Sequence, residues 1–454
     1  MQSTKTNKAQ VNTTTPKQFS DKKPAVINVI WLYIILISII VAAYTGKMDA
    51  IGKASLDSAK GAVELAISLI GAMALWLGIM KVAEAAGLMR AIAKAIRPVM
   101  VRLFPDVPAE HPAMSAIIMN MAANMLGLGN AATPMGIKAM SELDKLNPQK
   151  GTATNAMCLF LAINTSSVTI LPLGVIAVRA ASGATTPGAI LVPAILATLC
   201  STTAAIIMSK LLAARNPMMI PVQSDESGES IENLTAPQTE AELNPPGLIG
   251  RIFAWIAILA FMVAIPLAIM RGGMPQDFFQ GVTSATGWLI PIIMGAFLLG
   301  AYFSGVKVYE TLTEGAKEGF QVAIRIIPFM VAIFVGIGML RASGALDLFT
   351  GFAGKYTKFI GMPPEILPHA LLRPLSGTGA YGYMAELIAK APDSLSAFMA
   401  SVLQGSTETT FYVLAVYFGS VGIRKTRHAL PAALFADAIG ILAAVFFSRL
   451  FYTV

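Results

Sequence analysis

The chain has 454 residues, of which 55% are hydrophobic and 13% charged, and its mean hydropathy is +0.67. Soluble proteins carry about 25% charged residues, so this composition excludes an ordinary soluble enzyme and indicates a surface that largely faces lipid. The net charge is +8, but no basic stripe is interleaved with aromatic residues. We therefore interpret the bases as residues that flank membrane spans and set their orientation, with no nucleic-acid partner.

The first quarter of the chain predicts two spans and one surface helix. Residues 1–24 are polar, and we expect a disordered cytoplasmic tail. The apolar run 25–44 is long enough for a retained membrane helix, and the lysines before it place the N-terminus inside. A second span is expected at 62–82, while the basic amphipathic segment 89–104 is expected to lie on the membrane surface.

The stretch 113–180 is unusual because its apolar runs are too short to cross a bilayer as one straight helix. Polar and turn-forming residues interrupt it in NMAANMLGLGNAATP at 120–134 and in NTSSVTILP at 164–172. Such interruptions predict re-entrant hairpins or discontinuous helices, whose free backbone groups must be satisfied by protein, water or ligand. A full span is expected next, at 187–213.

The second half follows an acidic linker. Residues 214–248 hold six acids and one base with few large apolar groups, so we expect a soluble linker there. A span at 249–270 has no counterpart in the first half. The remaining expected elements are spans at 286–304 and 318–340, an amphipathic segment at 345–359, broken runs over 366–424 and a last span at 429–452.

One half of the chain repeats in the other. Residues 59–70 read AKGAVELAISLI and residues 316–327 read AKEGFQVAIRII, and both halves carry polar breaks at matching places. Duplicated membrane halves of this kind are typical of secondary transporters. If each copy crosses the membrane an even number of times, the extra span inverts the second copy. We therefore predict an all-α polytopic membrane protein with two homologous halves, 25–213 and 249–454, in an inverted repeat with re-entrant or discontinuous helices.

The polar breaks of the first half supply the first candidate binding residues. Asn120 and Asn124 are one helical turn apart and share a face. That face either lines a solute cavity or bonds across to a neighbouring helix. The run 164–167 can cap half-helices or present hydroxyls to a ligand. The first-half candidates are Asn120, Asn124, Asn130, Thr133, Asn164, Thr165, Ser166 and Ser167.

The second half adds RPLSGTGA at 373–380 and QGSTETTFYVL at 404–414. A carboxylate at membrane depth is a functional-site hypothesis by default, so Glu408 is the most diagnostic residue. It can pair with Arg373, bind a cation or carry a coupling proton, and the alternatives are a purely structural ion pair or an interfacial Arg373. Asp437 could face the bundle interior. The second-half candidates are Arg373, Ser376, Thr378, Gln404, Ser406, Thr407, Glu408 and Thr409.

Other chemistry has little support in the residues. Cys158 and Cys200 lie in apolar runs, and the histidines His111, His369 and His428 are far apart, near expected membrane boundaries, where we expect them to be solvated. No spacing suggests a metal site or a phosphate-binding loop. We therefore expect no cofactor and no bound metal, and we do not expect an enzyme.

Long motifs resemble a known family. ANMLGLGNAATPMGIKAM (123–140) and INTSSVTILP (163–172) resemble spore maturation protein A, whereas RPLSGTGA and GSTETTFYVLAVYFGSVGIRKTRHAL (405–430) resemble spore maturation protein B. The chain resembles a fusion of the two, within the membrane group that carries the nucleoside recognition, or gate, domain. That resemblance implies a re-entrant inverted-repeat bundle in a bacterial inner (cytoplasmic) membrane and a nucleoside or other small solute. The spore role is not carried over, because this chain departs from those proteins in being fused.

Two functions follow as expectations. The first is an integral inner-membrane permease for a small polar solute, driven by an ion gradient, with its substrate between the paired polar loops. Its partners would be the lipid bilayer, the solute and a coupling ion, and the Gly- and Ala-rich helices would permit a homodimer. The alternative is a non-transporting membrane scaffold, or an envelope or spore-maturation factor, whose polar breaks only hold helices together.

Overall fold

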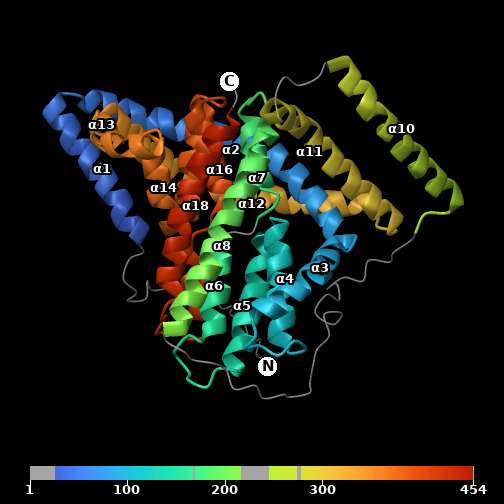
Figure 1. Cartoon of the computed structure of the whole chain (residues 1–454). Coiled ribbons are helices and arrows are strands. Elements are labelled where there is room, and N and C mark those ends of the chain that lie inside the picture. The colour runs from blue at the N-terminus through green and yellow to red at the C-terminus, as the bar shows by residue number, and fades with distance from the viewer. Residues whose placement is uncertain (1–25, 128, 167–168, 216–244, 273–277, 453–454) are drawn as a thin grey trace, which may run out of the picture.

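The computed structural model describes residues 26–127, 129–166, 169–215, 245–272 and 278–452 (Figure 1). Within these ranges the regular elements are helices, joined by turns and loops, and one isolated bridge links Thr152 and Lys425. The expected tail at 1–24 and nearly all of the expected linker at 214–248 lie outside the described residues.

The helices follow the same order in both halves. The first half contains α1 (Val26–Thr45), α2 (Met48–Ala85), α3 (Leu88–Leu103), α4 (Pro112–Met125), α5 (Gly129–Lys145), α6 (Asn155–Thr165), α7 (Leu173–Ala181), the 3-10 helix η1 (Pro187–Ile190) and α8 (Leu191–Arg215). The second half contains α10 (Leu248–Gly272), α11 (Phe278–Phe303), α12 (Val308–Ala342), α13 (Ala345–Thr357), η2 (Lys358–Ile360), α14 (Ile366–Leu375), α15 (Gly377–Lys390), α16 (Leu395–Ser406), α17 (Thr410–Ser420) and α18 (Ala429–Phe451).

Among the described α-helices, α1–α8 match α11–α18 in order, and α10 is left without a counterpart. The long α2 matches α12, and in both copies a glycine with left-handed backbone, Gly87 (φ 85°) or Gly344 (φ 88°), turns the chain into a short amphipathic helix, α3 or α13. Two short helices, a broken helix and a long last helix follow in each copy. The repeat expected from the sequence is thus present.

The second copy is inverted relative to the first. The helix α18 ends at the upper side of the molecule in Figure 1. Tyr452, where α18 ends, donates to the carbonyl of Asp393, and the Asp393 carboxylate accepts hydrogen bonds from Thr185, just before η1 and α8 begin. At the lower end, Arg427, just before α18 begins, donates to the carbonyl of Ala153, just before α6 begins. The helices α8 and α18 pack together, so the two equivalent helices run in opposite directions, as an inverted repeat requires.

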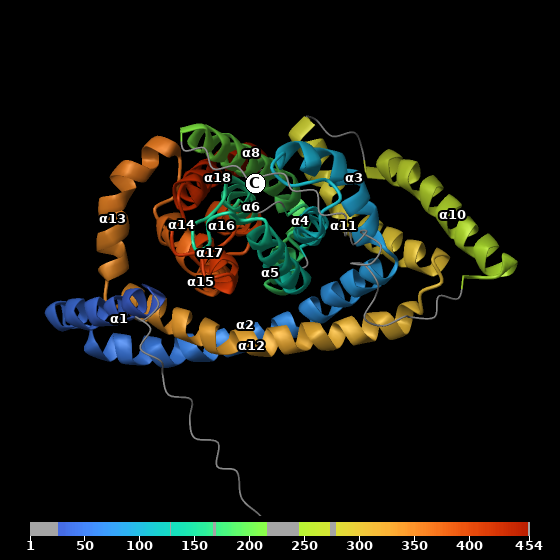
Figure 2. The same cartoon turned by 90° about the horizontal axis from the view of Figure 1, so that it is seen from below.

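The repeated sequences pack against each other. The helices α2 and α12 form the most extensive helix pair among the described residues and run side by side along one edge of the molecule (Figure 2). Gly319 sits so close to α2 that an added Cβ would lie 2.6 Å from the carbonyl oxygen of Met73. Small residues at a crossing allow helix backbones to approach. Both helices begin before the expected apolar spans, at Met48 and Val308.

The described helices are those of a multi-pass membrane protein. Three of them are long and apolar enough to span a bilayer, namely Met48–Ala85, Pro187–Arg215 and Ala429–Phe451. A fourth is obtained if Ile327–Ala342 and Ala345–Ile360, bent by 83°, count as one broken span. On α10 the large apolar side chains point outward, with Trp255 64% exposed. The protein therefore presents apolar surface that only lipid or another apolar partner can cover.

Candidate functional site

Two helical hairpins enter the molecule from opposite ends. In the first, α4 and α5 pack side by side, and Asn120 on α4 donates a 2.7 Å hydrogen bond to the carbonyl of Ala132 on α5. In the second, Tyr383 on α15 donates to the carbonyl of Glu365 at the start of α14. The first hairpin turns at Gly127 (φ 72°), where the carbonyl of Leu171 leaves no room for a Cβ. These are the re-entrant hairpins that the short apolar runs predicted.

Two broken helices run beside the hairpins, and their breaks touch. α6 begins at the lower end, capped by Thr154, and α16 begins at the upper end, capped by Ser394. Each stops midway, and the chain continues as α7 or α17. The backbone N–H of Glu408, in the second break, donates a 3.1 Å hydrogen bond to the carbonyl of Thr165, which ends α6. The two polar motifs therefore converge inside the molecule, as the sequence predicted.

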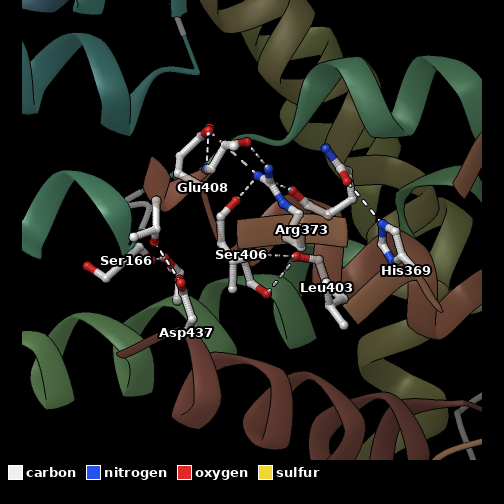
Figure 3. Close-up of polar contacts among 12 residues, drawn as sticks. Ser166, His369, Arg373, Leu403, Ser406, Glu408 and Asp437 are labelled. Atoms are coloured by element: carbon white, nitrogen blue, oxygen red, sulfur yellow. Dashed lines mark hydrogen bonds and ion pairs between the residues drawn. The ribbon is translucent and has the colours of Figure 1, made fainter. Parts of the chain in front are cut away.

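Arg373 is the centre of the second-half cluster (Figure 3). It is 3% exposed, and its guanidinium donates to Thr409 Oγ1 at 2.9 Å, to the carbonyl of Gln404 at 3.4 Å and to the carbonyl of Thr407. Such carbonyls at a helix C-terminus lack partners within the helix, so Arg373 caps α16. An interfacial position for this arginine, one of the alternatives, is therefore wrong: α14 carries it into the interior.

Glu408 forms an unequal ion pair with this arginine. Its Oε2 lies 3.7 Å from the Arg373 guanidinium, but the Glu408 side chain is 47% exposed whereas that of Arg373 is 4% exposed. The structural ion pair expected as an alternative is thus present. It occupies only part of the carboxylate, whose remaining surface is accessible to water or to a ligand. A partly exposed carboxylate midway along a broken membrane helix is a functional candidate.

Three asparagines form a network with a tyrosine that the sequence did not single out. Asn124 Nδ2 donates to Asn164 Oδ1 at 2.9 Å, and Tyr417 from α17 donates to the same oxygen at 3.3 Å. Asn120 donates to the Tyr417 hydroxyl at 3.2 Å, and the Tyr417 ring stacks on Phe160. Asn120 and Asn164 are buried, whereas Asn124 is half-buried. The network ties the first hairpin to both broken helices, which favours the role of interhelical bonding for Asn120 and Asn164.

The first break is fastened to α8. Ser166 donates to Thr202 Oγ1 at 3.0 Å, and Thr198 donates to the carbonyl of Ser166 at 3.2 Å. Thr165 bonds back to the carbonyl of Ala162. These hydrogen bonds hold the break in place. Thr198 and Thr202 carried no signal in the sequence beyond being polar residues in an apolar span.

The remaining candidates make mostly local contacts. Ser376 caps α15 by accepting from the N–H of Gly379, and Thr378 beside it is exposed. Ser406 bonds back to the carbonyl of Leu403 at 3.4 Å, and Thr133 is half-buried on α5. The side chain of Asn130 and all of Ser167 lie outside the described residues.

The histidines differ from expectation. His369 is 0% exposed, bonds Gln404 at 3.1 Å and stacks on Tyr383, and His428 is 6% exposed. The expectation of solvated boundary positions is wrong for both, because α14 and the start of α18 are enclosed by neighbouring helices. His111 caps α4 by accepting from the N–H of Ala113. Among the described residues, no three His, Cys, Asp or Glu side chains gather as a metal site would require.

Asp437, by contrast, does face the interior. It is 3% exposed, and its Oδ2 accepts a 2.6 Å hydrogen bond from Thr410, the first residue of α17. Its other oxygen is buried and has no hydrogen-bond partner among the described residues. The helix α18 therefore brings a second carboxyl group to the break that contains Glu408.

A cleft of about 240 Å³ lies elsewhere, at the lower end. Its lining includes Asp106, Asn155 and Lys210. Burial raises the pKa of Asp106, which lies in the loop after α3. None of the candidate residues that the structure describes lines this cleft. The polar chemistry of the breaks and the hollow shape of this cleft therefore suggest two different binding sites. We favour the breaks as the binding site because both copies contribute residues to them.

Together these features define a multi-pass membrane protein built from two inverted copies, each with a re-entrant hairpin and a broken helix. The model of the Gate family, described as nucleoside recognition, matches residues 66–182 and 323–424. These two segments contain both hairpins and both breaks.

Two curated relatives match most of their own length. Spore maturation protein A of Bacillus subtilis (strain 168) is 44% identical over 184 residues, 40% of this chain and 94% of the relative. Spore maturation protein B of the same organism is 46% identical over 165 residues, 36% of this chain and 93% of the relative. The chain belongs to the Gate family of membrane proteins, and it joins a half related to spore maturation protein A to a half related to spore maturation protein B. No solved structure matches the chain significantly.

Proposed function

We propose that the protein is a permease of the bacterial inner membrane for a small polar solute, driven by an ion gradient. The observation that carries the proposal is the contact between the two breaks, where Glu408 bonds Thr165 and remains half-exposed. Inverted repeats whose broken helices meet at mid-depth are the usual build of secondary transporters. The solute would bind among Glu408, Asn124 and the hairpin tips. No catalytic step and no cofactor belong to this proposal.

A nucleoside-like solute is the first choice to test, and its support is the description of the family as nucleoside recognition. The cytoplasmic N-terminus and a homodimer are parts of the same proposal, supported by the basic tail and by the Gly- and Ala-rich helices. The relatives are bacterial and are named for spore maturation. A dehydrating role in spores is not part of the proposal.

The experiment begins with a thermal-shift screen of the purified protein against nucleosides, amino acids, dicarboxylates and metal ions. A ligand that binds only the native state raises the apparent stability, and the increase grows with the logarithm of the ratio of ligand concentration to dissociation constant. A solute that stabilises the protein is then tested for counterflow in proteoliposomes. We expect Glu408→Gln to reduce uptake at least ~10-fold, equivalent to ~1.4 kcal/mol.

Glu64→Gln is the matched control. Glu64 is a glutamate on α2 whose side chain is 65% exposed and pairs with Lys60 at 3.6 Å. Its substitution should leave uptake unchanged. Normal uptake by Glu408→Gln would remove Glu408 from the site, and a protein that no solute stabilises and that catalyses no counterflow would contradict the permease.

A membrane scaffold is the second candidate, and the asparagine network favours it. Asn120, Asn164 and Tyr417 satisfy one another, as interhelical bonding requires. A scaffold predicts that no member of the solute panel raises the melting temperature. It also predicts that Glu408→Gln changes no property other than stability.

A further inference from the structure

Asp437 is a buried carboxyl group that the proposed solute site does not use. Its side chain lies on α18, one of the helices long and apolar enough to span the membrane, and is 3% exposed. Thr410 donates to Oδ2, and Oδ1 has no hydrogen-bond partner among the described residues. A carboxylate with an unpaired buried oxygen is strongly disfavoured, whereas the neutral acid is tolerated. The geometry is therefore that of a group that holds a proton.

Among the described residues, one cation and one carboxylate act on Asp437, namely Arg373 and Glu408. Arg373 already donates to Thr409 and to the carbonyls of Gln404 and Thr407. At the level of Asp437, α8 contributes hydroxyls: Ser201 donates to the carbonyl of Ala436, the residue before Asp437. Lys210 of α8 lies more than two turns beyond Ser201.

The position also links Asp437 to the break. Thr410 begins α17 and is two residues from Glu408, which is half-exposed (Figure 3). Thr407 precedes Glu408 and packs against α18 at Gly440, one turn along that helix from Asp437. A Cβ added to Gly440 would lie only 2.9 Å from the Thr407 methyl group. A rearrangement of the break would therefore move the only hydroxyl that holds the Asp437 carboxyl among the described residues.

We propose that Asp437 is the residue that binds the coupling proton, and that Glu408 and Arg373 serve the solute side of the same break. This inference rests on the proposed permease function and names its coupling ion. The step is a simple protonation: Asp437 Oδ1 takes a proton from water that reaches the break, and returns it to water when the break opens to the other side. No bond to the solute forms.

Infrared spectroscopy of the purified full-length protein tests the proton directly. At neutral pH the wild-type protein should show the C=O stretching band of a protonated carboxylic acid, which shifts when water is replaced by D₂O. The band should be absent from Asp437→Asn, which keeps an oxygen for Thr410, and present in Glu408→Gln and in the exposed-loop control Asp393→Asn. A wild-type protein without the band, or an Asp437→Asn protein with all of it, overturns the proposal.

A second variant protects the test against misfolding. Thr410→Val removes the hydroxyl that bonds Oδ2, so it should move the band without abolishing it. An unmoved band in folded Thr410→Val protein would assign the proton to another group and would also overturn the proposal.

Proteoliposomes separate this inference from the permease itself. With a solute identified by the thermal-shift screen, an imposed pH gradient should drive accumulation by the wild-type protein, and Asp437→Asn should retain counterflow while losing accumulation. Counterflow in a wild-type protein that lacks the infrared band would overturn the proton site and keep the permease. The band together with an absence of counterflow would contradict the permease and leave Asp437 as a protonated residue without a coupling role, which overturns the coupling assignment.

Discussion

The backbone N–H of Glu408 donates a 3.1 Å hydrogen bond to the carbonyl oxygen of Thr165. Thr165 ends α6 of the first copy, and Glu408 lies in the break between α16 and α17 of the second. A carbonyl at a helix C-terminus has no partner within its own helix. The second copy supplies that partner, so each copy is completed by the other inside the molecule.

This mutual dependence predicts the behaviour of a split chain. If the protein is divided between Arg215 and Leu248, the two fragments should copurify when produced together, because α2 packs on α12 and α8 on α18. Either fragment alone should be unstable or aggregated, since it would expose those faces. Copurification from a detergent extract checks the expectation, and fragments that remain folded and apart would contradict it.

Arg373 should be essential for stability. Arg373→Met removes the donors to Thr409 and to the α16 carbonyls, and we expect a loss of about 3 kcal/mol, because hydrogen bonds from charged groups contribute about 1.5–3 kcal/mol each. Arg373→Lys keeps the charge but not the forked geometry, so its stability should lie between that of the wild type and that of Arg373→Met. Thermal or denaturant unfolding in detergent measures both. Equal stability of Arg373→Met and the wild type would exclude the capping role.

Tyr417 should hold the asparagine network together. Tyr417→Phe keeps the ring that stacks on Phe160 and removes the hydroxyl shared by Asn120 and Asn164. We expect a destabilisation of about 1–3 kcal/mol, because buried polar groups lose a partner. Tyr412→Phe, an exposed tyrosine on the same helix, is the control and should be neutral. Unfolding curves of the two variants would show no difference if the network were unimportant.

The crossing of α2 and α12 should not accept side chains. Gly319→Ala would place a Cβ 2.6 Å from the carbonyl oxygen of Met73 and 2.7 Å from Ala74 Cα, both backbone atoms. Overpacking of this kind costs about 1–3 kcal/mol. Gly61→Ala on α2 meets no atom within 4 Å and should instead be neutral or stabilising by up to ~1 kcal/mol. Gly319→Ala should therefore lower the melting temperature, whereas Gly61→Ala should leave it unchanged or raise it. An unchanged melting temperature in Gly319→Ala would argue against close packing at Gly319.

The loop at the upper end should give a pH-dependent stability. Hydrogen bonds from Thr185, at 2.6 Å from Oγ1 and 3.0 Å from the backbone N–H, together with Arg179, hold the pKa of Asp393 below its ordinary value. A carboxyl whose pKa is lower in the folded state stabilises the protein above its unfolded pKa. That contribution is lost as the pH falls through the folded pKa.

The variant that tests this is Asp393→Asn. It should lower the stability by about 1 kcal/mol at neutral pH, a small value because Asp393 is exposed. The difference from the wild type should shrink as the pH is lowered. A difference that is constant between neutral and acidic pH would show that the Asp393 carboxylate contributes nothing through its charge.

The sequence predicted much of the fold because its signals are local. Short apolar runs broken by Asn, Gly and Pro indicate hairpins and broken helices wherever backbone groups must be satisfied at membrane depth. The repeat of 59–70 at 316–327 likewise needs no tertiary information. Helix starts at Met48 and Val308 were missed because amphipathic turns outside the apolar cores carry little hydrophobic signal.

The candidate site was predicted in part. Glu408 and Thr409 are neighbours within one motif, whereas Arg373 reaches them only because α14 packs against α16 and α17. Tyr417 and Asp437 were harder to place, since each is a single polar residue in an apolar helix, and its partners lie far away in the sequence. Only the packing of α17 against α6 and α18 brings those partners within reach.

The sequence by itself determined that the chain is a duplicated membrane protein, because hydrophobic runs, their polar interruptions and the internal repeat can all be recognised from the order of residues. The tertiary structure decided that the copies are inverted and that their breaks bond to each other. It also decided that Arg373 is buried and that the Glu408 side chain is half-exposed. These depend on which distant helices become neighbours, and burial and pairing set the energy of a charge far more than its position in the chain does.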